Sequence, residues 1–546
     1  MKWWIVGLTA LVGGALWQGT SVHADQVMRS TTNVPVTTLD VSTYASTADA
    51  EAIQAQSEGL YTYNAHNRIM LGVAKQKPTV NQARTRYTFQ LRHTHWSNGD
   101  EVTASDFVYA WRRVVDPATG SRNASKLSVI KNAVAITAGK KNVTQLGVKA
   151  IGKYTLQITL AAPSQYLPQL LAGRAFGPLD QSYVERVGSK YGTSSKYTVS
   201  NGPFTVQNWT GSRDRHWSYV KNPQYWDRKV VKIQRVKIAM IATSAKAAAL
   251  FDQGKVAYAQ LTDRTLQRYI GQKVIHQELT KTTAYLFFNT QQKQLQNVHL
   301  RRAIAHSYNK VLLARGVLRD GSSPLNGLIP TGLVKDPVHH RDYRAAEKGV
   351  ATSKYSLRQS HKEWLLAKKQ LHTSNIKLQL LVSNAAGNQN MAEFMQAQLQ
   401  HNLPGLKVSI KTVTLAQRIK LEEAGHFQMV IGTWTPNSPD PANYVSFFAS
   451  KSLANVPQYS NRRYDQGLRD LSGCLANRSV ARWRKIQQLE KQAIQGATVV
   501  APIYQQGVTY LQKPNVTGLN LSSFGAIVNY KYVRLHKNKR VEKKAV

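Results

Sequence analysis

The chain has 546 residues, which is too long for one small core and indicates two to four domains. Its composition is 42% hydrophobic with 25 Tyr and 11 Trp, which excludes a largely disordered chain. Lys and Arg outnumber Asp and Glu by 72 to 29, so the formal net charge is +43 and the surface should attract polyanions. The basic residues are spread along the whole chain and no nucleic-acid-binding motif is present, so we do not expect nucleic acid as a partner.

Cys474 is the only cysteine. One chain can therefore form neither a disulfide nor a cysteine-based metal cluster. Because Cys474 follows the sequence Leu-Ser-Gly at 471–473, we expect it to pack as a small apolar group.

Residues 1–24 have the pattern of a cleavable signal peptide. Lys2 supplies the positive start, residues 3–17 form an apolar core, and residues 22–24 (VHA) predict cleavage before Asp25. A transmembrane anchor is the alternative, but the apolar run is short for a span of about 20 residues. Cleavage would lower the formal charge from +43 to +42, because it removes Lys2.

The first third of the mature chain predicts a series of helices and strands. A helix is expected over 48–58, with Gly59 as its C-cap. The alternation of residues 87–91 predicts a half-buried strand, and residues 97–100 (SNGD) predict a turn. Thr103 and Asp106 then form a capping box, so a helix should follow and stop before Pro117. The residues expected on its buried face are Phe107, Ala110, Trp111 and Val114. A strand pair is expected at 146–151 and 154–160.

The remaining chain alternates strands with helices. A turn is expected at 200–204, a helix at 245–251 and a basic loop at 331–360. Further strands are expected at 284–290, 376–382, 406–413, 427–434 and 499–504, and further helices at 298–311, 390–399 and 481–494. This order predicts an α/β protein of two lobes with several chain crossings, and such folds bind their ligands between the lobes.

The sequence does not favour an enzyme. It contains no G-x-S-x-G nucleophile elbow, no phosphate-binding P-loop and no H-E-x-x-H zinc motif. His93 and His95 could chelate a metal, but without a third ligand we interpret them as a solvated strand end. We therefore expect no catalytic residues, no metal and no cofactor.

Several segments closely resemble a known family. They are residues 96–117 (WSNGDEVTASDFVYAWRRVVDP), 58–60 (EGL), 201–204 (NGPF), 222–227 (NPQYWD) and 288–290 (FNT). They resemble the oligopeptide- and dipeptide-binding proteins of ABC importers, the OppA/DppA family (extracellular solute-binding family 5). The resemblance implies a two-lobed fold like that of type II periplasmic binding proteins, with an extra subdomain in the first lobe.

The same resemblance implies domain boundaries. After the signal peptide (1–24), lobe I would comprise residues 25–62 and 190–275, with the subdomain at 63–189 inserted between them. Lobe II would comprise 276–500. Residues 501–546 would return to lobe I and end in a basic tail.

The resemblance also implies ligand-binding residues. The family pattern G-W-x-x-D-x-x-[DE]-P places Trp434 beside the ligand, and its first Asp would pair with the N-terminal ammonium of a peptide. Here that position is Asn437, and Asp440 follows. An amide cannot neutralise a buried ammonium. Three explanations remain open: weaker peptide binding, substitution by Asp440, or a ligand without a free amine. Three further cleft contacts are implied, Tyr504, Asn201 and Gly202. Asn123 stands where the family has an aromatic residue, and a core position is the alternative for Trp434.

These features predict an extracellular solute-binding protein of an ABC importer. It would be a monomer that captures peptides between its lobes and delivers them to a membrane permease. Gram-positive members of the family usually carry a lipid-anchored cysteine after the signal peptide, and none follows it here. Anionic wall polymers are therefore a further expected partner. The alternative is a binding-protein fold reused as a cationic, wall-associated or adhesive protein.

Overall fold

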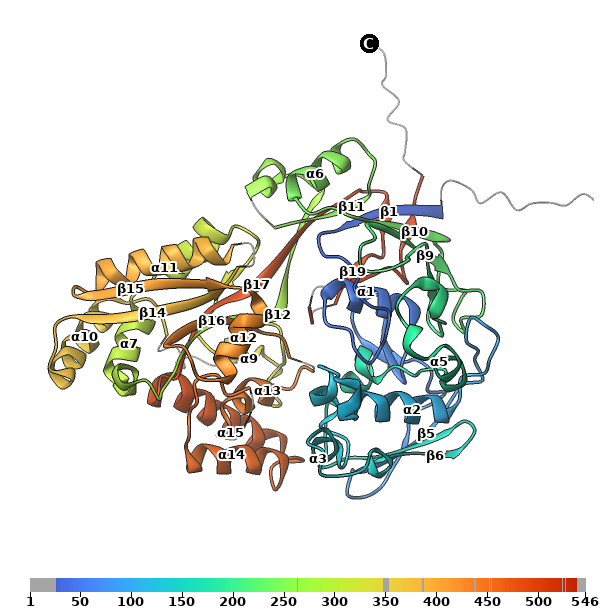
Figure 1. Cartoon of the computed structure of the whole chain (residues 1–546), viewed down its shortest axis with the longest axis horizontal. Helices are drawn as coiled ribbons and strands as arrows, with labels where there is room; N and C mark the ends of the chain where they lie inside the picture. The colour runs from blue at the N-terminus through green and yellow to red at the C-terminus, as the bar shows by residue number, and fades with distance from the viewer. Residues whose placement is uncertain are drawn as a thin grey trace, which may run out of the picture.

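The computed structural model describes residues 26–537 except 263, 347–352, 385–386, 437, 451, 453, 523 and 526. The chain forms two lobes joined by a single large sheet (Figure 1). The expected signal peptide and the end of the basic tail lie outside the described residues. The two-lobed α/β prediction is confirmed, while the individual domain boundaries stay predictions.

Lobe I is built on one end of the 11-stranded sheet. Its strand order is β11-β1-β10-β9-β8, with bounds Tyr258–Leu261, Val27–Thr32, Arg235–Met240, His216–Lys221 and Phe204–Gln207. The inner face buries Met28, Trp217, Tyr219, Val236 and Ile238 against helix α1 (Thr47–Gln56). The structure ends α1 at Gln56 with Ser57 as an extended C-cap, so the prediction that the helix continues to a C-cap at Gly59 is wrong.

A second sheet forms the subdomain of lobe I. Its order is β4-β5-β7-β6, with bounds Thr79–Val80, Arg86–Gln90, Thr155–Thr159 and Val148–Gly152. Helix α2 (Ala104–Val115) packs on this sheet and begins with the predicted Thr103–Asp106 capping box. Trp111 is fully buried, and its indole N–H donates to the Phe176 carbonyl at 3.0 Å. The shorter helices here are α3 (Ala133–Thr137), α4 (Leu167–Leu171) and α5 (Gln181–Val187).

Lobe II carries the other end of the large sheet, in the order β15-β14-β16-β12. The parallel strands are β14 (Ile376–Ser383), β15 (Leu406–Val413) and β16 (Met429–Trp434). One face is covered by α7 (Val298–His306), α10 (Leu357–Leu371) and α11 (Asn388–Asn402). The other face is covered by α13 (Ala442–Val445), α14 (Arg462–Ser472) and α15 (Ser479–Lys491). Because both faces are covered, β16 begins as a continuous buried run, whereas the edge strand β15 alternates between buried and exposed residues.

Two long strands pass through both lobes. β12 (Ile275–Phe288) and β17 (Val500–Gln512) pair antiparallel, from Ile275–Leu511 in lobe I to Phe287–Val500 in lobe II. Their register shifts between Leu279 and Thr283. The sequence predicted only the lobe II half of each strand. Residues 277–283 are largely polar, so the first half of β12 lacks the apolar pattern that predicts a buried strand.

The register shift is held by side-chain hydrogen bonds. The Thr280 hydroxyl donates to the Gln506 carbonyl at 3.1 Å, and the Gln505 amide donates to the Thr280 carbonyl at 2.8 Å. The Thr282 and Thr435 hydroxyls lie 2.7 Å apart. A second shift follows between Ala284 and Tyr285, so the pairing of β12 with β17 is irregular where the strands pass from one lobe to the other.

Smaller elements complete the described chain. They are β2 (Tyr61–Tyr63), β3 (Ile69–Leu71), β13 (Ser323–Pro324), α6 (Ser244–Asp252), α8 (Lys310–Leu312), α9 (Tyr343–Ala346), α12 (Leu415–Glu423), β18 (Val516–Thr517), β19 (Asn520–Leu521), β20 (Val528–Asn529) and β21 (Arg534–Leu535). Cys474 is exposed, so the prediction that it packs internally is wrong. Among the helices that the structure describes, none has the length and apolar character needed to cross a bilayer.

Glu51 is a carboxyl group buried in the core of lobe I. It lies on α1 and accepts from the hydroxyls of Tyr219 and Tyr530 at 3.4 and 3.5 Å. Burial raises the pKa of Glu51 from 4.5 to about 8, which those hydroxyls and a backbone N–H of Val528 only partly oppose. The native state therefore keeps this carboxyl protonated near neutral pH.

We predict that Glu51→Gln flattens the pH dependence of stability. The unfolded state releases the Glu51 proton near pH 4.5 and the native state only near pH 8, so wild-type stability should fall across this interval. The loss is at most about 5 kcal/mol for a shift of this size. Urea unfolding at pH 5 and pH 8 should show the loss in wild type and in the exposed control Glu423→Gln, but not in Glu51→Gln. An equal loss in all three proteins would show that Glu51 is ionised in the native state.

Candidate ligand site between the lobes

A pocket of about 270 Å³ has walls from both lobes. Lobe I and its subdomain contribute the start of α1, the segment 169–176 and the returning segment 522–527. Lobe II contributes Thr435 and Pro436, which directly follow β16. A ligand held here would touch both lobes at once, which is how a hinged protein couples binding to closure.

The charged groups in this pocket are cations. Arg174 donates from its guanidinium to the Gln54 side chain at 2.8 Å, and its buried Nε has no partner among the described residues. Burial lowers the pKa of Arg174, and the nearby Tyr44 and Tyr63 partly offset this effect. Lys126 lies 4.6 Å from the Tyr44 ring centre and donates to the Tyr44 hydroxyl at 2.9 Å. No carboxylate is found among the described residues that line the pocket.

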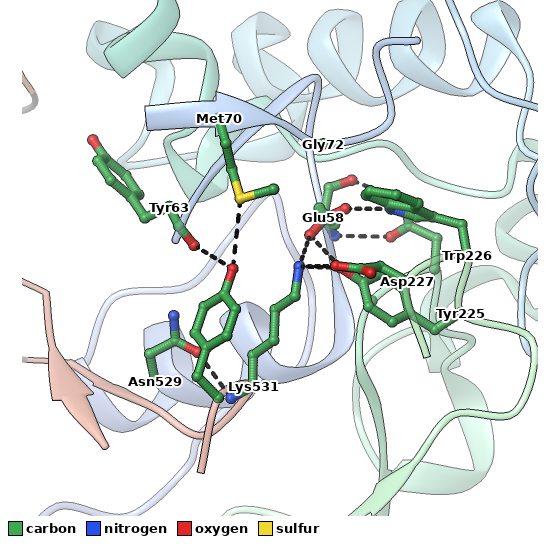
Figure 2. Close-up of polar contacts among 12 residues, drawn as sticks. Glu58, Tyr63, Met70, Gly72, Tyr225, Trp226, Asp227, Asn529 and Lys531 are labelled. Carbon is green, nitrogen blue, oxygen red and sulfur yellow. Dashed lines mark hydrogen bonds and ion pairs between the residues drawn. The ribbon is translucent and has the colours of Figure 1, made fainter. Parts of the chain in front are cut away.

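A smaller cavity of about 90 Å³ adjoins the pocket and shares Tyr63, Arg174 and Phe524 with it. Its other wall contains Glu58 and Lys531. Figure 2 shows these two side chains pointing toward each other, with Tyr225 and Asp227 beside them. The cavity therefore borders a buried ion-pair network.

Glu58 is the centre of that network. Its carboxylate accepts from the Tyr225 hydroxyl at 2.5 Å and from the Trp226 indole at 2.6 Å. Lys531 lies 3.3 Å from Glu58 and 3.1 Å from Asp227 (Figure 2). Burial by itself would lower the pKa of Lys531, but the charges of Glu58, Tyr532 and Asp227 outweigh burial and raise it. The network ties the segment after α1 and Asp227 to the C-terminal return of the chain.

Three of the sequence-predicted residues support the pocket from behind. Asn201 is fully buried and exchanges two hydrogen bonds with the Glu58 backbone, at 2.8 and 3.0 Å. Gly202 packs so tightly that an added Cβ would lie 2.6 Å from the Gln56 carbonyl carbon. Asn123 donates to the Tyr44 carbonyl at 2.9 Å and accepts from Lys126 at 2.7 Å. These residues hold the wall in place but do not line it.

Trp434 and Tyr504 lie at the lobe II end of the hinge. Trp434 is the last residue of β16, and its ring packs edge-on against Phe447 with centroids 5.0 Å apart. Its buried indole N–H has no partner among the described residues. Tyr504 is 8% exposed on β17, where it pairs with Ala284. Neither lines the pocket, although Thr435 next to Trp434 does. Asn437 lies outside the described residues.

Asp440 has a partner of its own. Arg482 of α15 donates to both of its carboxylate oxygens, at 2.9 and 2.8 Å. Both residues are partly buried, and such a two-pronged pair is among the stronger ionic contacts in proteins. The carboxylate is therefore not free to replace the missing acid at position 437.

The sequence reasoning missed Arg174, Lys126 and Lys531. Arg174 and Lys126 are unremarkable among 72 basic residues, since neither belongs to a recognisable motif. Lys531 begins the basic C-terminal stretch 531–544 of the sequence, where an exposed side chain is expected, yet it is 3% exposed. The one sequence signal for Lys531 was Glu58. It belongs to the motif at residues 58–60 (EGL), and a carboxylate that is buried needs a partner.

We predict that Lys531→Met destabilises the protein by about 3 kcal/mol or more, because it leaves the Glu58 carboxylate buried without its cation. Chemical denaturation measures the change. The exposed Lys229→Met should shift stability by less than about 0.5 kcal/mol. Similar small losses for both variants would show that the tyrosine and tryptophan donors suffice for Glu58.

Comparison with known proteins agrees with this architecture. The family model described as bacterial extracellular solute-binding proteins, family 5 Middle, matches residues 68–455. The chain is 30% identical over 492 residues to the dipeptide-binding protein of Lactococcus lactis subsp. cremoris, covering 87% of this chain and 88% of that protein. It is 27% identical over 522 residues to the oligopeptide-binding protein OppA of Bacillus subtilis, covering 92% of each. The solved structure of Listeria monocytogenes OppA bound to peptide superposes with a TM-score of 0.81 at 30% identity, covering 94% of this chain and 100% of that one. The chain belongs to the family 5 bacterial extracellular solute-binding proteins.

Proposed function

We propose that this protein is the peptide-binding component of an ABC importer and delivers its ligand to a membrane permease. Its relatives named above include a dipeptide-binding and an oligopeptide-binding protein, and one is solved with a bound peptide. Members of this family bind solutes and do not transform them, and we expect no catalytic turnover here. The resemblance of residues 96–117 to the family points in the same direction.

The pocket between the lobes is the observation that carries this proposal. Its walls include Thr435 from lobe II and Arg174 from lobe I, so a bound ligand bridges the two halves. The lobes are connected through β12 and β17, whose pairing is irregular between Leu279 and Thr283. Closing the lobes on a ligand requires a change in backbone angles at few positions, and this segment provides them.

The charges of the pocket favour a ligand that presents a carboxylate. Arg174 and Lys126 both face it, and a guanidinium binds a carboxylate in a two-pronged geometry. In contrast, the position of the family's amine anchor is Asn437, and Asp440 is already paired with Arg482. We infer that the ligand is held mainly through a carboxyl group, such as a peptide C-terminus, and not through its amine.

We further propose that the protein is exported through cleavage of residues 1–24 and carries no lipid anchor, since the only cysteine is Cys474. A formal charge of +42 after cleavage would then contribute to its retention among anionic wall polymers.

The first prediction of this proposal concerns the natural ligand. Purified mature protein should release a peptide on denaturation that mass spectrometry identifies, and calorimetry should detect rebinding of that peptide. Calorimetry with a pool of di- to hexapeptides covers the case in which purification strips the ligand. Recovery of no peptide, together with no heat of binding from the pool, would contradict peptide transport.

The second prediction concerns Arg174. Arg174→Gln should weaken binding of a peptide with a free C-terminal carboxyl by about 10- to 100-fold, because a hydrogen bond to a charged group contributes about 1.5–3 kcal/mol. The same peptide with a C-terminal amide should lose less than about 3-fold, since it has no charge for Arg174 to bind. The exposed control Arg186→Gln should leave both affinities unchanged. Equal losses for the acid and the amide would show that Arg174 only supports the fold.

A further inference from the structure

A second groove, of about 980 Å³, lies on the outer face of the lobe I sheet. Strands β1, β9 and β10 form its floor, and the start of α6 forms one side. Figure 1 places β1, β10 and α6 along the upper edge of the molecule, far from α14 and α3 at the lower edge. The groove shares no lining residue with the pocket between the lobes.

The strand pattern explains why this face is charged. Successive side chains of a strand point to opposite faces, and Met28, Val236 and Ile238 point into the core. Arg29 and Lys237 are therefore on the outer face, where they lie side by side in the β1–β10 register. Arg235 lies two residues before Lys237 on the same face, a separation of about 7 Å along the strand. The sheet thus arranges its cations in a regular ladder.

Six cations line this groove: Arg29, Arg215, Arg235, Lys237, Lys246 and Lys255. No described residue forms an ion pair with any of them, and the described lining contains no carboxylate. Elsewhere in the protein, Lys and Arg side chains such as Arg113 and Arg482 do pair with carboxylates. Six unpaired like charges around one recess repel one another and attract a multivalent anion.

The remaining lining distinguishes among polyanions. Among the described lining residues, Trp217 is 2% exposed and His216 carries the only exposed aromatic ring, so a nucleic-acid base finds no large aromatic side chain on which to stack. Ile238 and Val256 are buried, and the other large apolar residues of the described lining, Met240, Ile241 and Leu250, are half-buried, so none is fully exposed for insertion into a bilayer. A recess with many cations, no large exposed aromatic ring and no fully exposed apolar side chain suits a flexible chain of phosphates.

We propose that this groove binds a linear polyol-phosphate polymer of the cell envelope, with its phosphodiester groups on the six cations. The inference does not depend on what the pocket between the lobes binds. Because the two sites share no residue, the protein can hold the polymer and a solute together. The inference rests on the proposed export of the protein, which the groove would then keep close to the cell surface.

The test measures binding of the mature protein to immobilised poly(glycerol phosphate) of defined length as a function of NaCl concentration. The groove variant combines Arg29→Gln, Arg235→Gln, Lys237→Gln and Lys246→Gln. The control variant combines Lys362→Gln, Lys369→Gln, Lys377→Gln and Lys407→Gln. These four lysines are exposed in lobe II and form no described ion pair, so the change in net charge is the same. Thermal unfolding of both variants establishes that they remain folded.

We expect the groove variant to bind the polymer at least about 10-fold more weakly than wild type. Its slope of log K against log salt should fall by roughly one for each phosphate that the groove no longer binds. The control should change both quantities much less. Equal losses in the two variants would overturn the proposal in favour of diffuse charge. Groove-dependent binding to vesicles of anionic lipid or to single-stranded DNA, without binding to the polymer, would overturn it in favour of that other partner.

Discussion

The pairing of β12 with β17 is the constraint on which the rest of the structure depends. These two strands are the central members of one sheet that continues from lobe I into lobe II. Their lobe II halves are buried on both faces, with Leu286 in one core and Phe287 in the other. At the lobe I end, Tyr510 and Leu511 of β17 are buried in two further cores, so the pair cannot leave either lobe without exposing a core. Between these anchored halves the register shifts near Thr280. A rigid pair with one irregular segment permits the lobes to change their angle without unfolding.

The carboxylates near the cleft have partners of opposite charge, whereas two cations that line the pocket have none among its described residues. In lobe II, Asp440 is neutralised by Arg482, and in lobe I, Glu58 is neutralised by Lys531. Arg174 and Lys126 have no carboxylate among the described residues of their pocket. When buried carboxylates have ionic partners and the cations that face a cavity have none, the cavity favours a ligand with an anionic group. The same logic applies on the surface, where the ladder of Arg29 and Lys237 has no acidic neighbours among the described lining residues.

The Glu58–Lys531 network also explains how distant parts of the chain form one lobe. Lys531 comes from the last described segment, whereas Glu58 directly follows the first helix and Asp227 follows the subdomain. Lobe I is therefore complete only after the chain has traversed lobe II. The hydroxyl of Tyr530, next to Lys531, lies 2.9 Å from the hydroxyl of Ser30 on β1. This hydrogen bond is a second contact between the end of the chain and its beginning.

The sequence by itself determined the elements and the family. The alternation at 87–91, the Thr103–Asp106 capping box and the Pro117 stop depend on neighbours within a few residues, so local physics settles them. The length of β12, the exposure of Cys474 and the partners of Asp440 and Lys531 depend on residues dozens to hundreds of positions away, and no local pattern encodes them. The candidate site also combines residues that local motifs identify with roles that depend on the tertiary structure. Trp434 and Asn201 could be named from motifs, but only the folded chain shows that neither lines the pocket while Arg174 and Lys126 do, because that distinction depends on which segments meet across the lobes.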